Sequence, residues 1–100
     1  MQVQVHSVHF DADAKLLEFI QSRLNKLEQF HDQIIGTEVF LRLDKSDVNA
    51  NKVAEIKMAV PGKELFAKKQ SRSFEEATDI AVEALRKQIR KYKTKQNDRV

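Results

Sequence analysis

The sequence predicts an α+β fold in the order β-α-β-β-β-α, in which both helices pack on one face of a four-stranded sheet. Apolar residues alternate with polar ones in four short stretches, which is the spacing of strands that cover a core on one side. In two longer stretches the apolar residues recur every three or four positions, as in an amphipathic helix. Pro61-Gly62 separates two of the alternating stretches and suits the central positions of a type II turn.

The first half of the chain contains a predicted strand, a helix and a second strand. Val3 and Val5 alternate with polar residues in the first strand. The helix is expected over residues 13–30, and Asp11 or Asp13 can cap its first turn. Its expected core stripe consists of Leu16, Leu17, Ile20, Leu24 and Leu27. The second strand is expected over residues 38–43. Its core-facing side chains would be Val39, Leu41 and Leu43.

The second half adds two strands and a helix after a polar loop, residues 44–52. The third strand is expected over residues 53–60 and the fourth over residues 64–70. Their predicted core-facing residues are Ala54, Ile56, Met58, Val60, Leu65 and Ala67. Ser73-Phe74-Glu75-Glu76 has the pattern of a capping box, so a helix is expected to begin there and to run to about Tyr92.

Positive charge is concentrated at the C-terminal end. Residues 86–100 carry seven basic residues and one acidic residue, a net charge of +6, whereas the whole chain carries +3. One or two cations near a helix C-terminus would complement the helix dipole. Seven exceed that need, so the sequence indicates a site for a polyanion, with nucleic acid a better candidate than an anionic membrane.

At 100° per residue, the predicted second helix separates into an apolar side and a basic side. The apolar side carries Ala77, Ala81, Val82, Leu85, Ile89 and Tyr92. The opposite side carries Arg86, Lys87, Arg90, Lys91 and Lys93. The basic residues therefore form a face, which favours contact with nucleic-acid phosphates.

The sheet face away from the helices is expected to remain solvated. It would display Gln4, His6, Phe40, Arg42, Lys57, Phe66 and Lys68. Aromatic rings among basic side chains can stack on unpaired bases, although single exposed aromatics are also normal cross-strand packing. The candidates for a second RNA-binding face are Arg42, Lys57, Phe66 and Lys68.

Composition indicates one folded domain, residues 1–93, followed by a basic and flexible tail, residues 94–100. A chain of 100 residues can bury a core without a metal or a disulfide, and no cysteine is present. The N-terminus has neither a charged leader nor a long apolar run, so we expect a cytoplasmic protein that does not enter a membrane.

Catalysis and metal binding find no support in the sequence. Neither a glycine-rich phosphate loop nor an HExxH motif occurs. The only histidines are His6, His9 and His31, and the first two point to opposite faces of a strand end. Ser71, Ser73 and Thr78 have no nearby histidine to act as a base. We therefore expect no enzymatic activity, no metal, no cofactor and no small-molecule substrate.

Five segments cover nearly the whole chain in an order found in a known family. They are residues 26–30, residues 39–43, Val60-Pro61-Gly62 with Leu65 and Ala67, residues 73–81 and residues 85–93. Together they resemble the ribosome hibernation promoting factors and the related ribosome-associated translation inhibitors, in their short form without a C-terminal dimerisation domain. The resemblance implies the same fold, binding to small-subunit rRNA in the channel of messenger RNA and transfer RNA anticodons, competition with both RNAs, and silencing of idle ribosomes under stress or in stationary phase.

By the same resemblance, the residues that contact ribosomal RNA lie on both helices. They are Arg23, Lys26, Arg86, Lys87, Arg90, Lys91, Lys93 and Lys95. Two positions depart from the family pattern: Ser7 stands where a glycine is often seen, and Arg86 where an acidic residue is.

Two other functions stay open at this point. A general double-stranded RNA-binding module shares the α-β-β-β-α order of the later elements. A membrane-surface or protein-interaction domain could use the basic helix, but the core needs Ala77, Leu85 and Ile89, which leaves no second apolar face for a bilayer.

Overall fold

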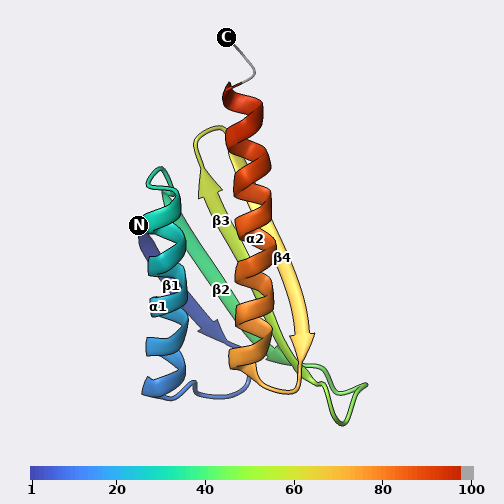
Figure 1. Cartoon of the computed structure of the whole chain (residues 1–100). Helices are drawn as coiled ribbons and strands as arrows, with labels where there is room; N and C mark the ends of the chain where they lie inside the picture. The colour runs from blue at the N-terminus through green and yellow to red at the C-terminus, as the bar shows by residue number, and fades with distance from the viewer. Residues whose placement is uncertain (98–100) are drawn as a thin grey trace.

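The computed structural model describes the backbone of residues 1–97 and the side chains of residues 1–93. The elements are β1 (Gln2–Ser7), α1 (Ala14–Phe30), β2 (Gly36–Leu43), β3 (Lys52–Val60), β4 (Lys63–Ser71) and α2 (Phe74–Asn97). The sheet has the order β1-β2-β3-β4, with β1 parallel to β2 and the other neighbours antiparallel. Both helices lie on one face of this sheet (Figure 1), which confirms the predicted fold.

The core lies between the helix layer and the sheet. Its largest fully buried apolar side chains are Ile20, Leu24, Val39, Leu41, Ile56, Met58, Leu85 and Ile89. Two residues expected in the core are exposed instead, Leu17 by 40% and Leu43 by 45%. Leu17 lies at the edge of its helical stripe, 100° from Leu16. Leu43 lies beyond Leu41, the last β2 residue that pairs with β1.

The first helix begins at a side-chain cap. Of the two candidate caps, Asp13 is the one used, and its Oδ1 accepts a hydrogen bond of 2.8 Å from the amide of Leu16. The helix ends at Phe30 and is capped by His31, whose backbone N–H donates to the carbonyls of Leu27 and Glu28. At the start of the helix, the carboxylate of Asp13 thus satisfies one of the amides that have no partner within the helix.

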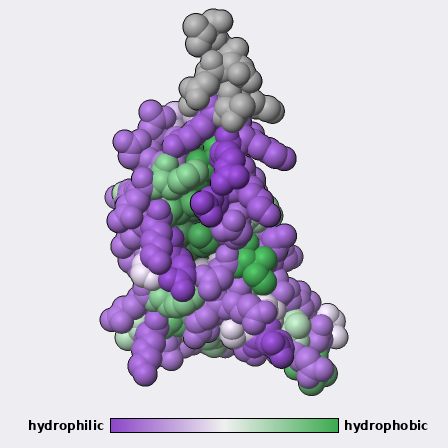
Figure 2. All heavy atoms as spheres, in the orientation of Figure 1, coloured by the Kyte–Doolittle hydropathy of each residue, from purple (hydrophilic) through white to green (hydrophobic). Residues whose placement is uncertain are grey.

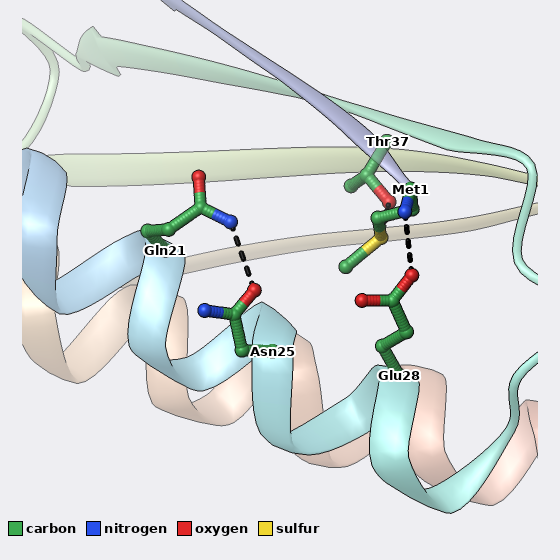
Figure 3. Close-up of polar contacts among 5 residues, drawn as sticks. All are labelled: Met1, Gln21, Asn25, Glu28 and Thr37. Atoms are coloured by element: carbon green, nitrogen blue, oxygen red, sulfur yellow. Dashed lines mark hydrogen bonds and ion pairs between the residues drawn. The ribbon is translucent and has the colours of Figure 1, made fainter.

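The start of β1 is held against α1 (Figure 3). The terminal ammonium of Met1 lies 2.6 Å from Oε2 of Glu28, and the hydroxyl of Thr37 in β2 donates to the sulfur of Met1 at 3.2 Å. On the same helix, Nε2 of Gln21 donates to Oδ1 of Asn25 at 2.9 Å. The contacts of Met1 thus join the start of β1 to α1 and to β2.

The second helix is longer than the hydrophobic pattern predicted. It begins after Ser73, whose hydroxyl accepts from the amide of Glu76 at 3.1 Å, as the capping box requires. It ends at Asn97 rather than near Tyr92, and its last turns project past the sheet (Figure 1). The segment after Tyr92 contains neither glycine nor proline, so nothing in it stops the helix where the core ends. Residues 94–97 of the predicted tail continue this helix, and residues 98–100 lie outside the described residues.

The turn between β3 and β4 is fastened to α2. Gly62 has a positive φ of 76°, which the second central position of a type II turn requires. The hydroxyl of Tyr92 donates to the carbonyl of Pro61 at 2.8 Å. One aromatic side chain of α2 thus contributes to the core and also fixes the turn.

A glutamine of α2 pairs with the outer edge of β4. The side chain of Gln88 accepts from the amide of Phe66 at 3.4 Å and donates to the carbonyl of Phe66 at 2.7 Å. The amide side chain therefore makes the same pair of bonds that a neighbouring strand would make.

His31 is buried where α1 ends against α2. Its ring packs edge to face on Tyr92, with centroids 5.7 Å apart, and no described residue hydrogen-bonds its buried Nε2. Burial lowers the pKa of His31 below its ordinary value of 6.5; the charge of Lys93 lowers it further, and Asp32 partly raises it. The fold therefore favours the neutral imidazole.

Acidification is expected to destabilise the fold through His31. Because the folded-state pKa is lowered, the unfolded chain binds more protons below about pH 6.5, and the stability from the neutral ring is lost as the pH falls through the folded-state pKa. Urea unfolding near pH 7.5 and near pH 5 should show a larger loss of unfolding free energy in the wild type than in His31→Phe, which keeps a ring against Tyr92. Equal losses in both proteins would assign the acid sensitivity to other groups.

Candidate nucleic-acid interface

The predicted RNA-contacting residues of α1 and α2 lie on the outer face of the helix layer. Of the expected core side of α2, Ala77, Ala81, Leu85, Ile89 and Tyr92 are at most 8% exposed, whereas Val82 is half-buried. Of the opposite side, Arg86, Lys87, Arg90 and Lys91 are exposed and Lys93 is half-buried. Figure 2 shows this face, where hydrophilic side chains surround an apolar strip between the helices. Lys95 belongs to α2 by its backbone, and its side chain lies outside the described residues.

The basic residues of α2 form two rows. Arg86, Arg90 and Lys93 follow the spacing i, i+4, i+7 on the side of α1, where Arg86 and Lys93 lie 5.4 and 5.0 Å from the ring centroid of Phe30. Lys87 and Lys91 form the second row. Lys87 lines a shallow hollow toward β4. The basic surface therefore spreads across both flanks of the helix.

Some of these cations already have partners within the protein. The ammonium of Lys93 donates to the carbonyl of Phe30 at 2.7 Å and so caps the end of α1. Nε of Arg23 lies 2.6 Å from Oδ1 of Asp79, which ties α1 to α2. Arg86 pairs with Glu83 at 3.7 Å. Pairs this exposed contribute little stability, about 0 to 1 kcal/mol, so a phosphate can compete for the cations.

Three other cations have no partner within the part of the chain whose side chains are described. Among the side chains that the structure describes, no hydrogen bond or ion pair involves the ammonium groups of Lys26, Lys87 or Lys91, and all three residues are exposed. They can meet a phosphate without giving up an internal contact. Of the predicted set, these three lysines can therefore bind a polyanion at the lowest cost in internal contacts.

A groove of about 460 Å³ runs between the two helices. It has an apolar floor and a charged rim, and it is lined by Arg23, Lys26, Leu27, Phe30, Asp79, Val82, Glu83 and Arg86. The groove brings three predicted residues from two elements together: Arg23, Lys26 and Arg86. Phe30, Asp79 and Glu83 were not predicted as site residues. The sequence signal for Phe30 was its position four residues after Lys26, on the same side of the helix.

The second predicted set, Arg42, Lys57, Phe66 and Lys68, lies on the opposite face of the sheet. Arg42 and Lys68 share Glu55, at 3.3 and 3.9 Å. Lys57 lies 5.5 Å from the ring centroid of Phe40, and Phe66 is 45% exposed. The sheet separates these residues from the basic surface of the helices. Because Glu55 on the same face pairs with two of its cations, this face is less suited to binding a phosphate.

The histidines do not gather into a site. His6 stacks on Phe40 with centroids 4.8 Å apart, whereas His9 lies in the turn after β1 with a positive φ of 66°. The described part of the chain contains no group of three histidine, cysteine or acidic side chains that could hold a metal ion. None of the helices within residues 1–97 is long and apolar enough to cross a membrane.

A mixed four-stranded sheet covered on one face by two helices, one of which has a basic C-terminal half, defines a compact α+β class of candidate polyanion-binding domains. Residues 3–97 match the model of the family described as Sigma 54 modulation protein / S30EA ribosomal protein, and the chain belongs to this family. The predicted family resemblance is thereby confirmed.

Individual relatives agree with this assignment. The ribosome hibernation promoting factor of Pseudomonas putida is 25% identical over 96 residues, which are 96% of this chain and 90% of that protein. Among solved structures, a ribosomal subunit interface protein from Coxiella burnetii matches with a TM-score of 0.85 and 21% identity, covering 94% of this chain and 99% of that one. The N-terminal domain of Thermus thermophilus Protein Y matches with a TM-score of 0.79 and 19% identity, covering 92% and 99%. At these identities the two structures establish the fold alone.

Proposed function

We propose that this chain is a ribosome hibernation factor, which binds the small ribosomal subunit and silences it by occupying the channel of messenger RNA and transfer RNA. Family membership supports this function, as does a relative named for ribosome hibernation. The observation that carries the proposal is the basic outer face of α2, opposite its buried side.

The proposed binding is electrostatic. Lys26, Lys87 and Lys91 meet phosphates directly, while Arg86 and Arg90 extend the basic surface along α2. Each neutralised phosphate releases counterions, which gives affinity without reading sequence. The folded body measures 49 × 25 × 18 Å, so it excludes other RNAs from the space it fills. Occupancy is sufficient for silencing, and no chemical step is part of the proposal.

Inhibition is therefore expected to be stoichiometric and reversible. In a purified translation system, synthesis should stop as the protein approaches the concentration of ribosomes, because each bound copy blocks one site. Preloaded messenger RNA and initiator transfer RNA should protect, since competitors for one site lower the apparent affinity.

Two results would contradict this function. Inhibition far below the ribosome concentration, with cleaved RNA, would indicate an enzyme. Equal affinity for duplex RNA and for the small subunit would favour a general RNA-binding module instead.

A further inference from the structure

We propose that the groove between α1 and α2 binds one unpaired guanine base of the RNA contacted by the basic face. This subsite deepens the proposed function and rests on it. The basic face would hold the RNA backbone, and the groove would select a nucleotide whose base is free to leave the stack.

The floor of the groove offers a surface for stacking. Phe30 is 38% exposed and lies beside Leu27 and Val82. The guanidinium of Arg86 lies 5.4 Å from the centroid of the Phe30 ring, so a planar, electron-poor group already contacts this ring. A base can take that place, because Arg86 is exposed and its ion pair with Glu83 is long, at 3.7 Å. Stacking on an aromatic side chain strengthens binding roughly 5- to 150-fold.

The rim of the groove distinguishes a base from a phosphate. Asp79 and Glu83 face the same space as the cations, so a phosphate inside the groove would meet two carboxylates. The N–H groups at the edge of a base would instead find acceptors there. Oδ1 of Asp79 already accepts from Arg23, which leaves Glu83 as the more available carboxylate.

Guanine suits this carboxylate better than the other bases. Its Watson–Crick edge presents two adjacent N–H donors, which match the two oxygens of one carboxylate, whereas uracil presents a single donor there. The volume of about 460 Å³ lies within the ordinary range for small-molecule sites. Lys26, exposed at the rim, can hold the phosphate of the inserted nucleotide.

The stacking surface is tested by substitutions at Phe30. Phe30→Leu keeps an apolar side chain and a good helix former but removes the ring, and should weaken binding to small subunits at least about fivefold. Phe30→Tyr keeps the ring and should bind like the wild type. Ile35→Ala is the control, since it removes an exposed apolar side chain that lies outside the groove and outside both predicted RNA-binding sets, and it should change affinity less than about twofold. Circular dichroism checks that all three variants fold.

The preference for guanine is tested without ribosomes. NMR titration with the pentaribonucleotide UUGUU should shift the signals of Leu27, Phe30 and Val82 at lower concentration than UUUUU does. Glu83→Gln should remove this difference, because the amide replaces one of the two acceptor oxygens of the carboxylate with a donating NH2 group.

Each outcome decides between the two proposals. Wild-type affinity of Phe30→Leu for small subunits, or oligonucleotide shifts confined to the basic residues of α2, would overturn the groove and leave the proposed function standing. Failure of the wild type to bind small subunits would overturn the proposed function. The oligonucleotide titration would still decide whether the groove accepts guanine.

Discussion

Replacing both Lys87 and Lys91 with glutamine is expected to weaken binding to the small ribosomal subunit about thirtyfold. Each exposed ammonium would lose one phosphate contact, and a loss of about 1 kcal/mol per contact gives this factor. The dependence of log affinity on log salt concentration should become shallower by about 1.5, because two fewer phosphates are neutralised. Glutamine is a good helix former, so thermal unfolding should be nearly unchanged.

The matched control removes the same charge elsewhere. Lys15 lies in the first turn of α1 and Lys45 in the loop after β2, and both are exposed. The variant Lys15→Gln with Lys45→Gln should bind within about twofold of the wild type. Equal weakening of both double variants would show that net charge, rather than the position of the two lysines on α2, governs binding.

Replacing Leu85 with alanine is expected to have the largest effect on stability, about 2 to 5 kcal/mol of unfolding free energy. Leu85 is 0% exposed and lies in the core cluster between α2 and the sheet, so truncation leaves a cavity. For a domain of this size, the loss corresponds to a decrease in melting temperature of more than about 8 °C. Thermal and urea unfolding followed by circular dichroism measure it.

Leu17→Ala provides the control for this prediction. Both variants replace a helical leucine with alanine, but Leu17 in α1 is 40% exposed, whereas Leu85 is fully buried. We expect a loss below about 1 kcal/mol, because less apolar surface returns to water and no closed cavity forms. Similar losses for both variants would mean that the core side of α2 has been assigned incorrectly.

Local chemistry explains which elements could be predicted from the sequence. The cap by the hydroxyl of Ser73 and the turn at Pro61-Gly62 each need only a few neighbouring residues, and both occur as expected. The alternation in β3 likewise depends on the two faces of one strand. Signals of this kind determined the order of the elements and the side of α2 on which the cations lie.

Contacts between distant segments could not be predicted in the same way. The ion pair of Arg23 with Asp79 joins residues 56 positions apart, and the groove exists only because α1 and α2 pack side by side. The exposure of Leu43 depends on where β1 stops, which its own strand does not encode. The end of α2 was missed because hydrophobic periodicity records where the core ends, while the helix continues past it.

The pairing of Gln88 with Phe66 also bears on how copies of the chain behave toward one another. The exposed edge of a sheet is a template on which a second molecule can add a strand, and this addition starts many aggregates. At the middle of β4, the amide of Gln88 already occupies the donor and the acceptor that an incoming strand would need. The helix that carries the basic residues thus also blocks strand addition at the middle of β4.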